Sequence, residues 1–176
     1  MRRQRLVEIL RGGDRRSIGK SNHIAKLVLR EPGRFRDLFQ CLWDEDPVVR
    51  MRAADAAEKA TVARPRLLNP HKQELLGLLA EAEQIELRWH VALMVPRLAL
   101  SKPERTRAAA ALQRYLEDPS SIVKTFALQG LADLAEQDRS LRETVKSALK
   151  GSLETGTAAM KARARKLLRK LKFDAV

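Results

Sequence analysis

The sequence predicts an all-α protein, a single domain over residues 1–176 built from about five stacked helical hairpins. Three observations support this fold class. Apolar residues recur at helical spacing along nearly the whole chain, a pattern typical of amphipathic helices packed around a core. Proline and glycine divide these segments into pairs, as at Pro32-Gly33. One helix pattern then returns at an almost constant interval, which indicates stacked hairpins that bury their apolar faces against each other.

The first hairpin, residues 1–32, is irregular and forms an N-terminal cap. A first helix is predicted over about residues 2–11 and ends at the Gly12-Gly13 turn. A second helix is predicted from about Ser17 to Arg30 and stops before Pro32-Gly33. Each has one apolar face, formed by Leu6, Ile9 and Leu10 in the first and by Ile18, Ile24, Leu27 and Val28 in the second.

Four more regular hairpins follow, at residues 33–63, 67–100, 103–137 and 139–172. Their helices are predicted over about residues 35–42, 47–60, 70–82, 85–98, 104–116, 119–134, 141–153 and 157–171. In each second helix an aliphatic residue precedes a basic one, and small or apolar residues follow at fixed offsets. These pairs are Val49-Arg50, Leu87-Arg88, Val123-Lys124 and Met160-Lys161, so the register advances by 38, 36 and 37 residues. This period predicts a solenoid.

The spacing within the pattern resembles the second helix of a HEAT repeat. Asp44 is followed by Val49-Arg50, Ala53 and Ala56-Ala57, which match the HEAT motif residue by residue. The copy with Asp118 and Lys124 keeps the spacing, whereas the other two copies have Ala82 and Thr155 at the acidic position. The resemblance covers about residues 33–172. It implies a right-handed α-α superhelix, a HEAT-like solenoid.

In the HEAT family the acidic and basic residues of this motif form a hydrogen-bonded ladder between neighbouring repeats. The resemblance therefore implies a structural role for Asp44, Arg50, Arg88, Asp118, Lys124 and Lys161. It also implies that the second helices line a concave groove. Two columns of side chains are expected there, Met51, Trp89, Thr125 and Ala162 in one and Arg52, His90, Phe126 and Arg163 in the other.

The candidate binding residues on this groove are Met51, Arg52, Trp89, His90, Phe126 and Arg163. Exposed aromatic side chains near an arginine are common anchors of binding sites. The alternative for Trp89 and Phe126 is that they turn into the stack and belong to its core. For His90 a half-buried structural role is favoured over a role as ligand or base.

The formal net charge of +13 lies at the two ends of the chain. Residues 1–30 carry a net +7 and residues 157–176 a net +6, whereas residues 31–156 hold nineteen basic and nineteen acidic side chains. The C-terminal cations are Lys161, Arg163, Arg165, Lys166, Arg169, Lys170 and Lys172. They form either a solvated cap of the stack or a contact surface for a polyanion.

Other classes of function find little support in the sequence. No apolar run approaches the roughly 18 residues of a membrane span, and the first residues lack the features of a secretory signal. The single cysteine, Cys41, fits a reducing compartment, so we expect a cytoplasmic protein. His23, His71 and His90 fall in different hairpins without ligand spacing, so we expect no metal and no cofactor.

We therefore expect a non-catalytic binding or scaffold module that presents a concave groove to a protein partner. The alternative is binding of nucleic acid, DNA in particular, through the basic terminal repeats. A third interpretation is enzymatic, because the chain resembles at the level of fold the HEAT-like alkylpurine DNA glycosylases. Those enzymes use a concave cleft with aromatic residues and a catalytic aspartate, and Asp55 and Asp133 are the aspartates of the second helices here.

Overall fold

The computed structural model describes residues 2–14 and 17–173, and this part of the chain contains ten α-helices and no strand. The all-α prediction is thus confirmed. The helices are α1 (Arg2–Arg11), α2 (Ser21–Arg30), α3 (Phe35–Gln40), α4 (Pro47–Ala63), α5 (Lys72–Glu81), α6 (Ile85–Met94), α7 (Lys102–Arg114), α8 (Ser121–Gln137), α9 (Arg142–Thr155) and α10 (Ala158–Lys170). Short 3-10 turns adjoin them at Pro32–Arg34, Cys41–Trp43, Pro65–His71, Val95–Arg97, Tyr115–Glu117 and Arg139–Leu141.

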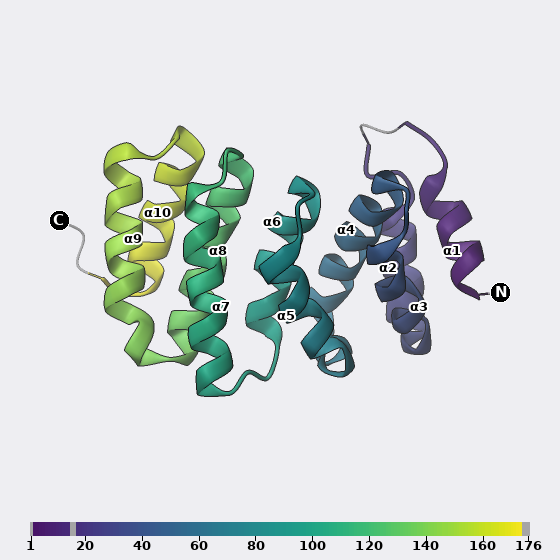
Figure 1. Cartoon of the computed structure of the whole chain (residues 1–176), viewed down its shortest axis with the longest axis horizontal. Helices are drawn as coiled ribbons and strands as arrows, with labels where there is room; N and C mark the ends of the chain where they lie inside the picture. The colour runs from purple at the N-terminus through teal and green to yellow at the C-terminus, as the bar shows by residue number, and fades with distance from the viewer. Residues whose placement is uncertain (1, 15–16, 174–176) are drawn as a thin grey trace.

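From α3 onward, consecutive helices pack against each other as hairpins, which follow one another along the long axis of the molecule (Figure 1). Helix α1 is joined to α2 in sequence but packs against α3 and α4. The second helices α2, α4, α6, α8 and α10 pack each against the next, and we call them the second-helix layer. The first helices of the hairpins, from α3 onward, pack on their own partners in this layer. None of the helices in the described ranges is both long enough and apolar enough to cross a membrane.

The connections between helices gather on two opposite edges. Loops that lead from one hairpin to the next lie at the lower edge in Figure 1, and we call residues 30–36, 64–72, 95–102, 138–142 and 169–173 the loop edge. Turns inside the hairpins that follow the first one lie at the opposite edge. We call residues 41–47, 81–86, 114–121 and 154–158 the turn edge.

Helix α4 shows how the local sequence sets an element and its packing. The side chain of Asp46 accepts a hydrogen bond from the Val48 N–H at 2.9 Å and so caps the helix. Pro47 occupies the first helical position, where the missing N–H costs nothing. A row of small buried residues then lets α2 and α6 approach closely. These residues are Ala53, Ala56, Ala57 and Ala60.

The predicted start of the second helix is wrong by four residues. Helix α2 begins at Ser21, and Ile18, which was expected on its apolar face, is 44% exposed. The reason lies in Gly19, whose φ of +51° places it in the left-handed region that glycine alone adopts easily. Ser17 and Ile18, which precede it, therefore lie outside the helix.

Polar side chains connect each hairpin of the stack to the next. Ser21 donates to Asp55, Arg97 to Glu58, Gln137 to the Pro96 carbonyl and Arg163 to Gln129. Partners in these contacts are 34 to 41 residues apart, close to the sequence period. The hydroxyl of Tyr115 adds a buried bond to the Leu79 carbonyl at 2.9 Å.

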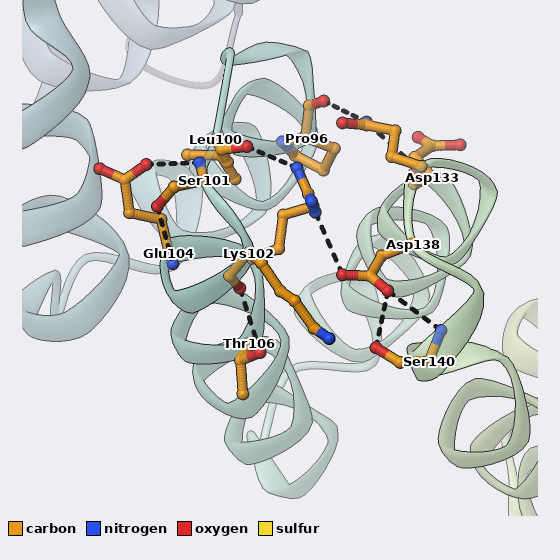
Figure 2. Close-up of polar contacts among 11 residues, drawn as sticks. Pro96, Leu100, Ser101, Lys102, Glu104, Thr106, Asp133, Asp138 and Ser140 are labelled. Atoms are coloured by element: carbon orange, nitrogen blue, oxygen red, sulfur yellow. Dashed lines mark hydrogen bonds and ion pairs between the residues drawn. The ribbon is translucent and has the colours of Figure 1, made fainter.

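The start of α7 shows this polar network in detail (Figure 2). Ser101 and Glu104 form a capping box, in which the Ser101 N–H donates to the Glu104 carboxylate at 2.7 Å. This bond, and then the Lys72 ammonium, lower the pKa of Glu104 to about 2. On the far side, Asp138 accepts from Arg105 at 3.3 Å and from the Ser140 N–H at 3.0 Å.

Candidate functional site

Three side chains on successive second helices form a row, which we call the aromatic row. Trp89 on α6, Phe126 on α8 and Arg163 on α10 are all half-buried. The ring centroids of Trp89 and Phe126 are 6.3 Å apart, and the Arg163 guanidinium lies 5.6 Å from the Phe126 centroid. These are distances of an aromatic pair and of a cation–π contact.

The repeat pattern positions this row. On α6 and α8 the residues Leu87, Val91, Val123 and Ala127 are buried in the core. Trp89 and Phe126 lie between these buried positions in sequence, so each ring packs its inner part on the stack and leaves its outer part exposed. Gln129 accepts a hydrogen bond from Arg163 at 2.7 Å and holds the guanidinium beside Phe126. The row thus offers apolar and cationic groups together.

The remaining members of the two predicted columns differ among themselves. Met51 is half-buried and Ala162 is exposed, so both belong to the surface of the second-helix layer. Thr125 is buried, and its hydroxyl donates to the Ser121 carbonyl at 2.7 Å.

The prediction of a surface role for Arg52 is wrong. Its side chain is 0% exposed, and its guanidinium donates to carbonyl oxygens at the end of α1 and in the α1–α2 connection. These acceptors are Leu10 at 2.6 Å, Gly12 at 2.6 Å, Ser17 at 3.1 Å, and Asp14. Gly19 makes room for this arrangement, because a Cβ there would lie 2.8 Å from the guanidinium carbon. Arg52 therefore anchors the first hairpin and is not available to a ligand.

His90 is 8% exposed and lies edge-on to the Trp89 ring, with centroids 5.5 Å apart. Burial lowers the pKa of the imidazole to about 4, against an opposing effect of Asp55 and a supporting effect of Lys59 and Arg97. The side chain is therefore neutral at pH 7 and packs against Trp89, one end of the aromatic row.

This burial predicts a pH-dependent stability. The unfolded chain takes up a proton at His90 near pH 6.5, whereas the folded protein does so only near pH 4. Since the unfolded state binds more protons between these values, we expect stability to fall as the pH drops through this window. Thermal unfolding of the wild type and of His90→Gln at pH 7 and pH 4.5 tests this. The variant should lose less Tm; an equal loss in both proteins contradicts the prediction.

The ladder residues make contacts between neighbouring hairpins. Arg50 donates to the carbonyl of Asp44 at 2.8 Å and to the side chain of Gln84, in the next hairpin, at 2.7 Å. Arg88 forms an ion pair with the buried Asp118 of the hairpin after it, and its guanidinium lies 4.4 Å from the Tyr115 centroid.

Three members of the ladder differ from that scheme. The carboxylate of Asp44 pairs with Arg3 and Arg11 of α1, each at 3.7 Å. The ammonium groups of Lys124 and Lys161 have no polar partner among the described residues, which for Lys124 agrees with Thr155 at the acidic position that follows it. Sequence spacing did not single out Gln84, Arg3 or Arg11, because none of them occupies a motif position.

The C-terminal cations do not form one surface. Arg163 belongs to the aromatic row, and Lys170 pairs with Glu136 at 2.8 Å and Asp133 at 3.5 Å. Lys161 is half-buried at the turn-edge end of α10. The others are exposed on different sides and at the loop-edge end of the helix, namely Arg165, Lys166, Arg169 and Lys172.

The groups considered for chemistry are engaged in structural contacts. Burial raises the pKa of the Cys41 thiol to about 11, and its sulfur lies 3.3 Å from the Asp37 carbonyl. Asp55 accepts from Ser21 at 2.5 Å and from Lys59 at 2.6 Å. Burial raises the pKa of Asp133, which accepts from Gln129 at 2.8 Å. Within the described ranges, no three His, Cys, Asp or Glu side chains are placed to hold a metal ion.

Comparison with known proteins adds no family to these observations. No protein-family model matches the chain, and no curated protein shows significant similarity to it.

Proposed function

We propose that the chain is a HEAT-like α-solenoid, a right-handed superhelix of five hairpins, that acts as a non-catalytic binding module for a protein partner. The motif spacing supports this fold, as do the contacts that connect each hairpin only to its neighbours. In a superhelix of this kind the second-helix layer lines the concave side, where a partner segment binds.

The observation that carries the proposal is the aromatic row. Trp89, Phe126 and Arg163 lie on three successive second helices, and the centroid distances of 6.3 Å and 5.6 Å give the row a length of at most about 12 Å. This length fits a peptide segment laid across the second-helix layer. Half-exposed aromatic rings beside an arginine suit a segment with an apolar anchor and a neighbouring carboxylate.

A selected peptide ligand provides the test. Peptides are selected from a random display library on the Trp43→Phe protein, in which Trp89 is the only tryptophan and its fluorescence reports binding. We expect Trp89→Ala and Phe126→Ala each to weaken binding of the selected peptide at least about tenfold, since anchor residues dominate such interfaces. Affinity is measured by titration, with Trp43 retained for the Trp89 variant and a labelled peptide as reporter.

Matched controls are available elsewhere on the surface. Ile18, just before α2, and Val62, near the end of α4, are exposed apolar residues outside the three helices that carry the aromatic row. Ile18→Ala and Val62→Ala should change the affinity less than about twofold. If the row variants remain folded by circular dichroism and bind as tightly as the controls, the proposal fails.

A further inference from the structure

The middle of the chain has equal numbers of acidic and basic side chains, but its exposed acidic and basic groups lie on different edges. The loop edge carries exposed cations without an ion-pair partner among the described residues. They are Arg30, Arg36, Arg64, Arg66, Lys102, Arg139, Arg169 and Lys172. Every inter-hairpin loop contributes at least one of them, as does the end of α10 (Figure 1).

The turn edge has the opposite character. Its exposed carboxylates are Glu45, Glu81, Glu83, Glu117 and Glu154, none of which forms an ion pair within the described ranges. Arg114 is the one cation within these residues. Arg50 and Arg88, which follow them in sequence, are engaged in the ladder contacts. Acidic turns and basic loops thus alternate along the chain. The fold places the acidic turns on one edge of the molecule and the basic loops on the opposite edge.

Acidic side chains of the loop edge are already neutralised. Glu31 pairs with Arg34 at 2.6 Å, Glu104 with Lys72 and Asp138 with Arg105. In Figure 2 the side chain of Lys102 points away from the capping box, and no contact is drawn to its ammonium group. The exposed cations of this edge therefore have no ion-pair partner among the described residues.

Two hollows on this edge are lined by cations. Arg36 and Arg66, from successive loops, line a hollow of about 470 Å³, whose one acidic lining residue is Glu74 of α5, 3.3 Å from His71. A second hollow of about 670 Å³ lies between the α8–α9 loop and the end of α10. Its charged lining residues are Arg139, Arg142, Lys170 and Lys172, with Glu136 as the one acid among them.

Helix stability does not account for these cations. Basic residues at the C-terminal ends of helices complement the helix dipole, which explains Arg30 and Arg169. Lys102 and Arg36, however, lie in the first turns of α7 and α3, where a positive charge opposes the dipole. Helix electrostatics therefore do not explain the placement of these two cations.

We propose that the loop edge binds the phosphate backbone of double-helical nucleic acid. Five hairpins at about 8–10 Å spacing make an edge of about 40 Å, slightly more than one turn of a duplex, about 34–36 Å. Most of the exposed cations are arginines, whose planar guanidinium matches phosphate geometry. This surface combines cations from the middle of the chain with Arg30, Arg169 and Lys172 of the two basic ends.

The chemistry of the edge favours a duplex over a single strand or a membrane. The described part of the loop edge has no exposed aromatic ring on which unpaired bases could stack. Among the exposed large apolar residues only Val62 lies beside it, too little to insert into a bilayer. Binding through phosphates alone predicts little dependence on base sequence.

The test measures binding of the full chain to a fluorescent 20-base-pair DNA duplex at several salt concentrations. If about six phosphates are contacted, the logarithm of the affinity falls with the logarithm of salt concentration with a slope of about −5. The loop-edge variant carries Arg64→Gln, Arg66→Gln, Lys102→Gln and Arg139→Gln. We expect its slope to shrink by about 3 to 4 and its affinity at 100 mM salt to fall about 100-fold.

A control variant removes the same charge elsewhere, through Arg5→Gln, Arg114→Gln, Arg165→Gln and Lys166→Gln. It should keep the slope and most of the affinity. Equal losses in both variants overturn the proposal, because net charge alone then explains binding. Absence of duplex binding at 50 mM salt, tighter binding of single-stranded DNA, or preferential binding to phosphatidylserine vesicles overturns it as well. Trp89→Ala should leave duplex binding unchanged, which keeps this test independent of the peptide site.

Discussion

Replacing Arg52 with methionine is expected to lower the free energy of unfolding by about 2–4 kcal/mol, because buried carbonyl groups lose their donor. The guanidinium is 0% exposed and donates to four carbonyl oxygens, of which that of Leu10 is fully buried. Methionine retains much of the aliphatic volume, so the loss reports the hydrogen bonds. Urea denaturation followed by circular dichroism measures the change.

The loss should concentrate in the first hairpin. In the variant, hydrogen exchange of the amides in α1 is expected to accelerate, since α1 then opens without its anchor, while exchange in α8 stays as in the wild type. Arg163→Met, which removes a half-exposed guanidinium with one side-chain acceptor, serves as a comparison and should cost less than about 1 kcal/mol. Unchanged protection of α1 in the Arg52 variant contradicts the anchoring role.

The same substitution, glycine to alanine, is expected to have opposite effects at two positions. At Gly130 on α8 a Cβ would lie 2.5 Å from the Ala92 carbonyl oxygen of α6 and 3.0 Å from the Leu112 side chain. Gly130→Ala should therefore cost about 1–3 kcal/mol through overpacking, in spite of the better helix propensity of alanine. At Gly77 on α5 nothing lies within 4 Å of a Cβ.

Gly77→Ala should accordingly stabilise the protein by about 0.5–1 kcal/mol, the gain in helix propensity alone. Urea midpoints of both variants are compared with the wild type under identical conditions. Stabilisation by Gly130→Ala would show that α6 and α8 separate easily, contrary to their close packing.

The helices themselves were predictable because their signals are local. The alanine row of α4 and the proline at its start specify that helix without reference to the rest of the chain. Burial of Leu87 and Val123 likewise follows from the repeat register. By contrast, the start of α2 depends on Gly19 and on Arg52, which are separated by more than thirty residues in the chain. The spacing of apolar residues along the chain gives no information about a contact between such distant residues.

The candidate surface was predictable where the surroundings repeat. Trp89 and Phe126 have hairpins of regular shape on both sides, and each is half-exposed beside the other. Arg52 occupies an aligned position, but its neighbour is the irregular first hairpin, which covers it. Aligning the repeats assumes that each aligned residue has the same neighbours. This assumption fails at the N-terminal cap, where the first hairpin is irregular. The two charged edges were likewise hidden, because a count of charges along the chain ignores where the turns lie.

The contacts between hairpins have a consequence for how the chain reaches its fold. Ser21 bonds to Asp55 and Arg163 to Gln129, each across 34 residues, and the hairpins stack strictly in chain order. Such topology gives a low contact order, so rapid folding is expected and can start at any hairpin. It also means that a whole hairpin inserted in register extends the molecule without disturbing contacts already made. The number of hairpins can therefore change in a single step, through duplication of the gene segment that encodes one hairpin.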